Sequence, residues 1–474
     1  MACRRLPVLS LLSARTHRQA LFIWRLQGHA PRLPPPPDRA TLSRRPDDTA
    51  VFQESIMADI APFRALRYDF AALEGDVSAR VAPPYDILDE NDRSRLLAQS
   101  DRNIVAIDLP FAPAKCLGPA HLYERAGRTF QQWIADGTLV REQRPALYVY
   151  HQTFEFAGRR YTRRMFIARL KLVPFDQGDV VPHEETFGGP KEDRLALMKA
   201  THANLSPVYG LYRDAEDRIG EAFAPAIDRQ PDAVATLEGV QNRVWIVTDA
   251  ATVDTIVATF RGKKCYIADG HHRYNTGLNY RDWVAQQLGG ELPAGHPAGF
   301  VMLVLGSMDD PGSLILPTHR VLAELGDMPL DKLVEAWKPG CEQVAAEQAD
   351  VTLHHGATGR EKHLRFTHRA ILAKLEPHKS AAWRDLDLAY LHRYLIDELF
   401  KSARPDGGAP VIRYVKAEDA AKQTARKEHG IAILCKPATM AQLRDVGEAG
   451  DLMPHKSTYF YPKVATGLTI NPLN

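Results

Sequence analysis

Apolar residues recur along this chain with the spacing of amphipathic helices in some segments and of buried strands in others. Residues 119–136 predict a helix, because apolar side chains recur on one face: Leu122, Ala126, Phe130 and Trp133. Pro119 suits the first turn of this helix, and Gly137 is placed to end it. Residues 146–151 and 160–172 predict strands, since they alternate and are rich in β-branched or aromatic residues.

The same two patterns continue through the rest of the chain. Further helices are expected at residues 193–202, 271–288, 330–337, 386–400, 417–428 and 439–448. In the second of these, we expect one apolar face with Tyr280, Val284 and Leu288. Short apolar runs predict strands at residues 243–248, 264–268, 299–305, 411–415 and 431–435. This mixture predicts a mixed α/β (α+β) fold, in an order too irregular for a TIM barrel or a plain Rossmann sheet.

Composition limits the classes of protein that fit. The 474 residues suffice for two or three domains, and 45% apolar with 25% charged residues is ordinary for a globular protein. No window approaches eighteen consecutive apolar residues, so no membrane span is expected. The scattered cysteines lack paired spacing, which favours a reducing, cytoplasmic location over a disulfide frame or a structural zinc site: Cys3, Cys116, Cys265, Cys341 and Cys435.

The net charge of +2 is unevenly distributed. Residues 1–56 contain nine arginines, no lysine and four acidic residues, a net charge of +5 that leaves about −3 on the other 418 residues. This Arg-rich segment with its proline run at 34–37 is either an organelle transit peptide or an extension upstream of a true start at Met57. We favour Met57, because globular patterning begins directly after it. The slightly acidic body makes a nucleic-acid partner unexpected.

Residues 263–274 contain the strongest candidate site. Their sequence, KKCYIADGHHRY, predicts a short buried strand, an Asp-Gly turn and a helix that opens with His271, His272 and Arg273. Free N–H groups and the positive end of the dipole at a helix N-terminus suit an anion, and a guanidinium matches phosphate oxygens. Gly270 allows a close approach of the backbone to a ligand, and Asp269 is placed to cap the helix or hold a metal ion. Neither a Walker loop nor a G-x-G-x-x-G motif occurs.

This segment resembles the signature of the ParB/sulfiredoxin superfamily, in particular its free serine kinase branch. The branch is similar to this chain at three places in the same order: Pro182-His183-Glu184, Asp269 to Arg273, and Lys456-Ser457-Thr458. Most of the chain also resembles the bacterial family called domain of unknown function 1015. That second resemblance rests on FRALRYD (63–69), APPYD (82–86), PHEET (182–186), ADGHHRY (268–274), LPTHR (316–320) and KSTYFYPK (456–463).

The resemblance implies a ParB/sulfiredoxin-like core with large insertions and a C-terminal α/β extension. Residues 57–240 would form an N-terminal α/β part with the His-Glu motif, and residues 241–325 the ParB-like core. Residues 326–474 would form a C-terminal α/β part with the Lys-Ser-Thr motif. The implied activity is transfer of phosphate between ADP or ATP and a small hydroxylated metabolite such as L-serine, with Mg²⁺ expected at the phosphates.

The resemblance also assigns roles to residues. Glu184 would be the general base, with Asp269 and His272 as further catalytic candidates. The residues expected to bind nucleotide or phosphate are Gly270, His271, Arg273, Lys456, Ser457 and Thr458. Candidates for binding the substrate are Arg64, Tyr85, Asp86, His319 and Arg320. Thr318 is free to cap a helix that would begin with His319 and Arg320, and a buried ion pair formed by these two residues is an equal alternative.

Other functions fit the residues less well. A phosphatase acting on a metabolite such as phosphoserine would use the same site in reverse, and the direction stays open. A non-catalytic ParB-like nucleotide- or DNA-binding protein is disfavoured by the acidic body. A sulfiredoxin-like reductase needs a cysteine where His271 stands, and a histidine-based metal hydrolase matches no standard zinc spacing. The oligomeric state and the metal ligands stay undetermined at this stage.

Overall fold

The computed structural model describes residues 58–114, 116–175, 177–184, 188–326, 328–401 and 410–474. The expectations for residues 1–56 and for a start at Met57 lie outside the described residues. Within the described ranges, no helix is both long and apolar enough to cross a lipid bilayer.

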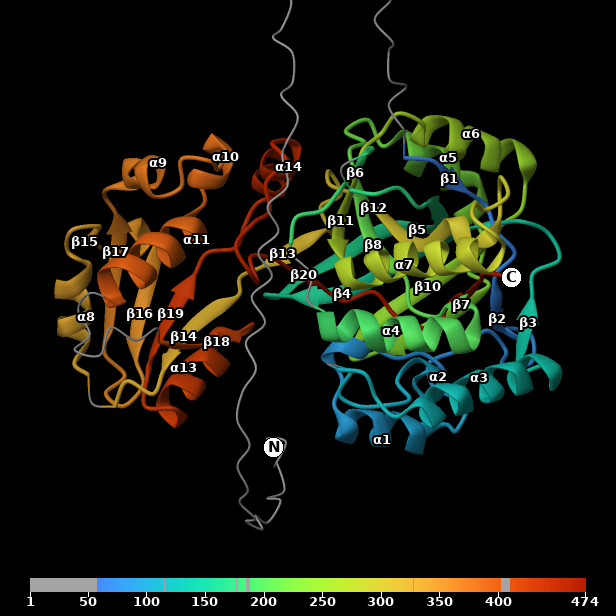
Figure 1. Cartoon of the computed structure of the whole chain (residues 1–474), viewed down its shortest axis with the longest axis horizontal. Helices are drawn as coiled ribbons and strands as arrows, with labels where there is room; N and C mark the ends of the chain where they lie inside the picture. Colours follow the sequence, from blue (N-terminus) through green and yellow to red (C-terminus); the bar gives the residue numbers. More distant parts are fainter. Residues whose placement is uncertain (1–57, 115, 176, 185–187, 327, 402–409) are drawn as a thin grey trace, which may run out of the picture. The chain divides into compact units, whose positions relative to one another are not determined.

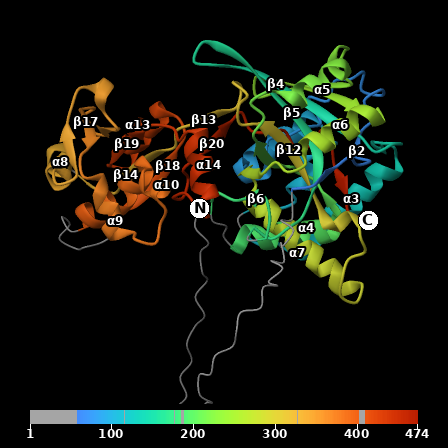
Figure 2. The same cartoon turned by 90° about the horizontal axis from the view of Figure 1, so that it is seen from above.

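A nine-stranded mixed sheet forms the framework of the site (Figures 1 and 2). Its order is β6 (Val180–Val181), β11 (Cys265–Asp269), β8 (Val208–Tyr212), β12 (Phe300–Ser307), β5 (Arg159–Lys171), β4 (Leu147–Phe156), β10 (Val240–Val247) and β9 (Ala233–Leu237), with β1 (Ile60–Ala61) also on β5. β6 is parallel to β11 and β8 is parallel to β12, and the remaining pairs are antiparallel. The order is therefore mixed, as the irregular sequence of elements predicted.

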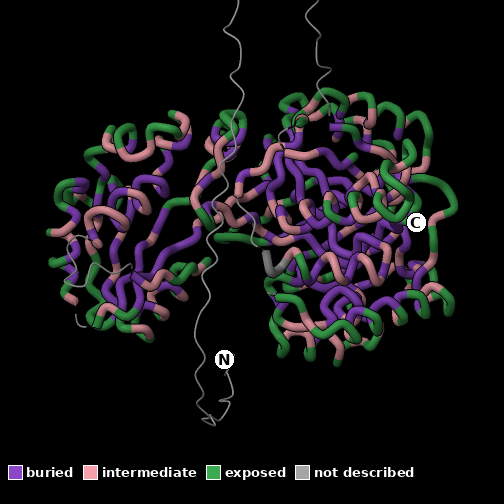
Figure 3. The backbone as a smooth tube through the Cα atoms, in the orientation of Figure 1, coloured by how far each residue is buried: buried purple, intermediate pink, exposed green. Residues whose placement is uncertain are grey.

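Both faces of this sheet are buried. Successive side chains of a strand point to opposite faces, so alternate residues show what covers each face. In β4, Tyr148 and Tyr150 belong to one hydrophobic cluster, whereas Leu147 and Val149 belong to another. In Figure 3, most of the tube in the middle of the part of the chain that contains this sheet is coloured as buried. Near-continuous apolar runs in the sequence therefore correspond to strands covered on both sides.

Helices cover the sheet in two groups. α7 (His271–Gln287) contacts β8 and β12, α4 (Gly188–Thr201) packs on α7, and α3 (Ala120–Ala135) packs on α4. The second group is α5 (Arg218–Ile227) and α6 (Ala250–Phe260), which pack on each other. The remaining elements of this part of the chain are smaller: β2 (Leu66–Tyr68) paired with β3 (Leu139–Arg141), η1 (Tyr85–Ile87), α1 (Glu90–Gln99) and α2 (Val105–Asp108).

A six-stranded sheet occupies the later part of the chain. Its order is β15 (Cys341–Gln343), β17 (Glu361–Phe366), β16 (Val351–His355), β19 (Ile431–Cys435), β14 (His319–Ala323) and β18 (Val411–Val415). The accompanying helices are α8 (Leu330–Trp337), α9 (Leu372–Leu375), α10 (Ala381–Arg384), α11 (Asp387–Tyr390), the π-helix η5 (Leu391–Phe400) and α13 (Glu418–Lys427). Short 3-10 turns lie at Pro297–Gly299, Ala346–Gln348 and Arg369–Ile371.

The last segment of the chain forms two short sheets, separate from the nine-stranded one. After α14 (Met440–Glu448), β20 (Tyr459–Tyr461) pairs with β13 (Leu314–Leu316), and β21 (Asn471–Pro472) pairs with β7 (Ala203–Asn204). This segment also brings the Lys-Ser-Thr motif to the His-Glu motif, since Thr458 bonds to His183.

Most expected elements are confirmed, several with the same bounds, such as α8, β18 and β19. The helix expected to begin at His319 and Arg320 is wrong: both residues lie in β14, whose residues are all buried. The apolar face expected on α7 is partly wrong, because Leu288 lies at its C-terminus with 55% of its surface exposed. Residue 240 begins β10, which pairs with β9, so strands on the two sides of the expected 240/241 boundary share one sheet.

Candidate functional site

The expected site residues meet at a cavity of about 430 Å³. Nine of them line it: Tyr85, Asp86, Glu184, Asp269, Gly270, His271, His272, Arg273 and Lys456. They come from η1, the segment after β6, the turn between β11 and α7, and the loop before β20. The cavity is also lined by Leu88, Pro113, Ala114 and His455. Three motifs that are far apart in the sequence therefore contribute to one concave surface of the size usual for small-molecule sites.

The turn between β11 and α7 requires a glycine. Gly270 is the N-cap of α7 and has φ of 89°, in the left-handed region that side chains disfavour. A Cβ atom at this position would lie 2.8 Å from Nε of Arg273, so the guanidinium packs directly on the turn. The prediction that Asp269 caps the helix is wrong, because the N-cap is Gly270 and no side chain caps it. The N-terminus of a 17-residue helix, with the positive end of its dipole, thus lies at the cavity.

Asp269 sits between two cations. Its Oδ1 accepts from Nζ of Lys463 at 2.9 Å, and its Oδ2 accepts from Nη2 of Arg273 at 2.8 Å. Burial opposes ionisation, but the charges of Lys463 and Arg273 outweigh it and hold the pKa of Asp269 well below its usual range. Asp269 is therefore a fixed anion near neutral pH, which makes it a structural ion-pair partner and a poor proton donor or acceptor.

Arg273 is largely committed within the protein. Its Nη1 donates to the carbonyl of Pro207 and its Nη2 to Asp269, and the residue is 5% exposed. Its guanidinium carbon also lies 5.9 Å from the centre of the Tyr85 ring. The guanidinium thus contributes charge at the cavity, while two of its nitrogens orient the turn.

His183 links all three motifs. Its Nδ1 donates to the carbonyl of Ile267 at 2.6 Å, so its neutral Nε2 accepts from the Thr458 hydroxyl at 2.8 Å. Its backbone N–H donates to Nε2 of His271 at 3.1 Å, and its carbonyl accepts from the N–H of Met453 at 2.9 Å. Burial lowers the pKa of both histidines. A neutral imidazole at 183 therefore holds Glu184, the next residue, in place beside α7.

Arg320 fixes the loop that carries Lys456 by hydrogen bonds to its backbone. Nη2 of this fully buried arginine donates to the carbonyls of His455 at 3.3 Å and Lys456 at 3.0 Å. Its Nε donates to Nε2 of His392 at 3.0 Å, and its Nη1 to the carbonyl of Thr318. Lys456 has φ of 58°, a left-handed conformation that these contacts support.

The hydroxyls of the Lys-Ser-Thr motif are used within the protein. Ser457 donates to the carbonyl of Pro454, and Thr458 donates to His183. This arrangement leaves the ammonium group of Lys456 as the part of the motif that faces the cavity.

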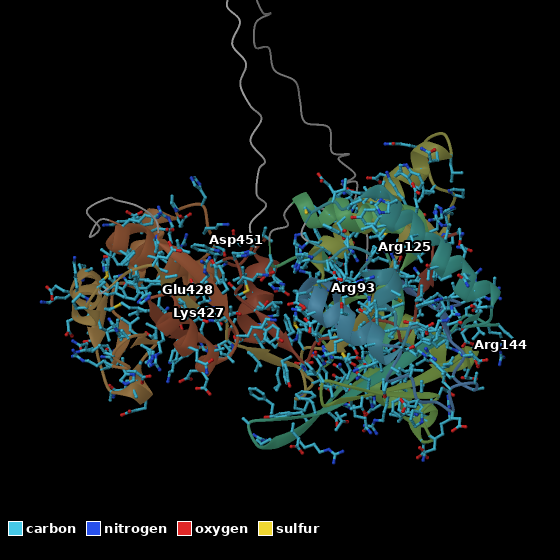
Figure 4. The ribbon with its side chains drawn as sticks, turned by 90° about the horizontal axis from the view of Figure 1, so that it is seen from below. Arg93, Arg125, Arg144, Lys427, Glu428 and Asp451 are labelled. Atoms are coloured by element: carbon cyan, nitrogen blue, oxygen red, sulfur yellow. The ribbon has the colours of Figure 1, made fainter. Side chains whose placement is uncertain are left out.

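The segment after α14 is fixed separately. Asp451, labelled in Figure 4, accepts from the N–H of Ser380 at 2.6 Å and lies 3.3 Å from Nζ of Lys379. The carbonyl of Leu452 accepts from the indole of Trp383 at 2.9 Å. These contacts set the path of the chain toward Met453 and Lys456.

Three expected substrate-binding residues, Arg64, His319 and Arg320, do not line the cavity. Arg64 is exposed and its Nε donates to the carbonyl of Glu142 at 2.8 Å, away from the cavity lining. His319 is buried, accepts from the N–H of Cys435 at 3.1 Å and lines a different cavity. With Arg320 under the Lys456 loop, the LPTHR segment supports the site from β14 without lining it.

Comparison with known proteins identifies the family. A family described as protein of unknown function, DUF1015, matches residues 60–389. This chain belongs to the DUF1015 family. The match ends before the segment from His455 to Lys463, so the family comparison does not include the loop that completes the cavity in this DUF1015 protein. No curated protein matches the sequence.

Several solved structures are similar at low identity. Free serine kinase in complex with AMP is 14% identical, covers 61% of this chain and 89% of that chain, and has a TM-score of 0.29. SbnI with a C-terminal truncation, from Staphylococcus aureus, is 14% identical, covers 64% and 87%, and has a TM-score of 0.31. A conserved hypothetical protein from Pyrococcus furiosus is 15% identical, covers 61% and 91%, and has a TM-score of 0.29. At these values the similarity says nothing about the activity of this chain.

Sequence reasoning missed two important residues of the DUF1015 protein. Lys463, the ion-pair partner of Asp269, was only the last residue of the KSTYFYPK segment. His183 belongs to the Pro-His-Glu motif, in which only Glu184 was assigned a role. The signal was present in both cases, since each residue belongs to a motif segment of the sequence. The bonding partner, however, lies 194 residues away for Lys463 and 275 residues away for His183, through Thr458.

Among the described residues, the carboxylates of the DUF1015 protein do not form a magnesium site, since no group of three His, Cys, Asp or Glu side chains is placed to hold a metal ion. Both oxygens of Asp269 already accept from cations. Asp269 therefore does not fit a resident Mg²⁺ ion.

Proposed function

We propose that this protein transfers a phosphoryl group between an adenine nucleotide and a small hydroxylated metabolite. The observation that carries the proposal is the convergence of Glu184, Lys456 and the N-terminus of α7 on one cavity. Phosphoryl transfer needs positioned positive potential for the phosphates and a group that accepts the hydroxyl proton. The cavity lining contains both.

The anion would lie at the first turn of α7. The positive end of the α7 dipole, the ammonium of Lys456 and the guanidinium of Arg273 supply positive potential, and His272 adds a polar side chain. Lys463 and Arg273 together outweigh the single charge of Asp269 between them, whereas Asp86 and Glu184 add negative charge to the same lining. The positive potential that favours a phosphate is therefore concentrated at the first turn of α7 and at Lys456.

Glu184 would act on the acceptor. Its carboxylate would take the proton of the acceptor hydroxyl while the hydroxyl oxygen forms a bond to the terminal phosphorus. The bond between that phosphorus and the bridging oxygen breaks, and its electrons leave with the nucleotide, so ATP would become ADP, or ADP would become AMP. L-serine is the acceptor suggested by the motif resemblance, and the reverse reaction or a phosphatase would use the same groups.

Phosphorus NMR tests the proposal directly. The protein would be incubated with ATP or ADP, magnesium and a panel of hydroxylated metabolites that includes L-serine. A new phosphomonoester resonance is expected with at least one acceptor. If no acceptor reacts and neither nucleotide raises the melting temperature, the proposal is wrong. Release of inorganic phosphate from phosphoserine without nucleotide would favour the phosphatase.

A further inference from the structure

A second cavity, of about 680 Å³, is lined by Tyr459, whose ring lies near Lys463, the ion-pair partner of Asp269 in the site described above. Its walls come from the end of β13, from β16, from the junction of β18 and α13, from the end of β19, and from β20. The volume lies in the range of small-molecule sites. None of the residues of the first cavity lines it.

The walls of this second cavity are mostly apolar and aromatic. Leu316, Val351, Tyr459 and Tyr461 contribute to them, and Ala417 lies at the start of α13. Tyrosine rings and aliphatic side chains of this kind bind flat, weakly polar groups, because such groups gain from leaving water and from stacking. The lining therefore suits a planar ring system.

Two lysines connect the two cavities through one ring. Nζ of Lys416 lies 4.2 Å from the centre of the Tyr459 ring, and Nζ of Lys463 lies 5.1 Å from the same centre. Lys416 lines the second cavity, whereas Lys463 bonds to Asp269, which lines the first. The charges of Asp86, Asp269 and Lys456, all lining the first cavity, act on Lys416. A ligand with a flat apolar end and an anionic end would meet positive charge at this junction.

In the proposed reaction, the reacting groups of both substrates occupy the first cavity, so only a non-reacting part of a substrate can occupy the second cavity. The acceptor hydroxyl has to lie beside Glu184 and the reacting phosphate beside α7, both in the first cavity. The part of the nucleotide that does not react needs further space. We propose that the second cavity binds the base and ribose of the nucleotide, with Lys416 and Lys463 beside the chain of phosphates that leads to the first cavity. This inference rests on the proposed function.

Calorimetric titration of the full chain with three ligands separates the two cavities. Adenosine probes the second cavity alone, pyrophosphate probes the first alone, and ADP probes both. The Ala417→Trp variant fills the second cavity, and the Lys456→Ala variant removes charge from the first. Asp419→Trp is the matched control, because Asp419 is exposed in the same helix and does not line the cavity.

We expect Ala417→Trp to weaken adenosine and ADP by at least about tenfold, a loss of about 1.4 kcal/mol, and to leave pyrophosphate unchanged. Lys456→Ala should weaken ADP and pyrophosphate but not adenosine, and Asp419→Trp should change none of the three. If Ala417→Trp leaves ADP and adenosine unchanged while Lys456→Ala weakens pyrophosphate, the second cavity is not the nucleoside site, although the proposed function stands. If the unmodified chain binds neither ADP nor pyrophosphate, both proposals fail.

Discussion

The backbone N–H of His183 donates a hydrogen bond to Nε2 of His271 at 3.1 Å and thereby joins two motifs that lie 88 residues apart. The N–H group can only donate, so Nε2 of His271 must be unprotonated. Burial and the neighbouring His183 lower the pKa of His271 well below its usual value, which agrees with this neutral form. The first histidine of α7 is therefore occupied in holding the Glu184 segment.

Replacing His183 tests this link. We expect His183→Ala to lower the free energy of unfolding by about 2–4 kcal/mol, since it removes a buried hydrogen bond to the Ile267 carbonyl and a partly buried one to Thr458. Urea denaturation measures the change. Thr458→Val is the matched control, because it removes only one of these bonds and should cost about 1 kcal/mol. An equal loss in both variants would show that the Ile267 bond contributes nothing.

Replacing Gly270 separates backbone strain from steric conflict. Gly270→Ala should destabilise the protein by about 2 kcal/mol or more, because a left-handed φ costs about 1 kcal/mol and the Cβ also meets the Arg273 guanidinium at 2.8 Å. Gly239→Ala is the control: its φ is 78° and no atom lies within 4 Å of the added Cβ. Thermal unfolding should therefore show a smaller loss at 239, and equal losses would contradict the close packing of Arg273 on the turn.

Replacing Asp269 should change the stability of the protein by an amount that depends on pH. The folded-state pKa of Asp269 is depressed below its unfolded value of about 3.9, so its ion pairs stabilise the fold above that pH and are lost as the pH falls toward the folded pKa. Asp269→Asn should therefore cost about 3 kcal/mol at pH 7, where it leaves Lys463 and Arg273 without an anion. The difference from the unmodified protein should shrink as the pH falls below about 4. Chemical denaturation at several pH values measures it, and a constant difference down to pH 2 would rule out the ion-pair explanation.

Replacing Glu184 tests the proposed base. Glu184→Gln should reduce the rate of phosphoryl transfer by about 10²–10⁴-fold, because the amide cannot accept the hydroxyl proton. Nucleotide affinity should stay within about threefold, which a thermal-shift titration measures, since the cations proposed to bind phosphate are unchanged. Glu192→Gln, at an exposed glutamate in α4, is the control and should retain full activity. Full activity in Glu184→Gln would overturn the assignment of Glu184 as base.

Local patterns in the sequence determined the elements of this protein. The apolar runs that became β11, β12 and β19, and the spacing that became α3 and α8, are properties of neighbouring residues, so the sequence was sufficient to predict them. The Asp-Gly turn before α7 was predictable for the same reason, because a left-handed residue there calls for glycine. The expectation for His319 and Arg320 failed because a proline followed by a capping residue can start a helix, whereas pairing with β18 and β19 fixes them in a strand.

Only the tertiary structure decided which side chains face the cavity and which support it. Lys463 bonds to Asp269, 194 residues earlier in the sequence, and Arg320 donates to the carbonyl of Lys456, 136 residues later. The hydroxyl groups of Ser457 and Thr458 donate to other groups of the protein. The residue type determines which hydrogen bonds and ion pairs a side chain is able to form. Its actual partners depend on which chain segments the fold brings together. The motifs could therefore be recognised along the sequence, whereas the division between ligand-facing groups and supporting groups follows from long-range packing alone.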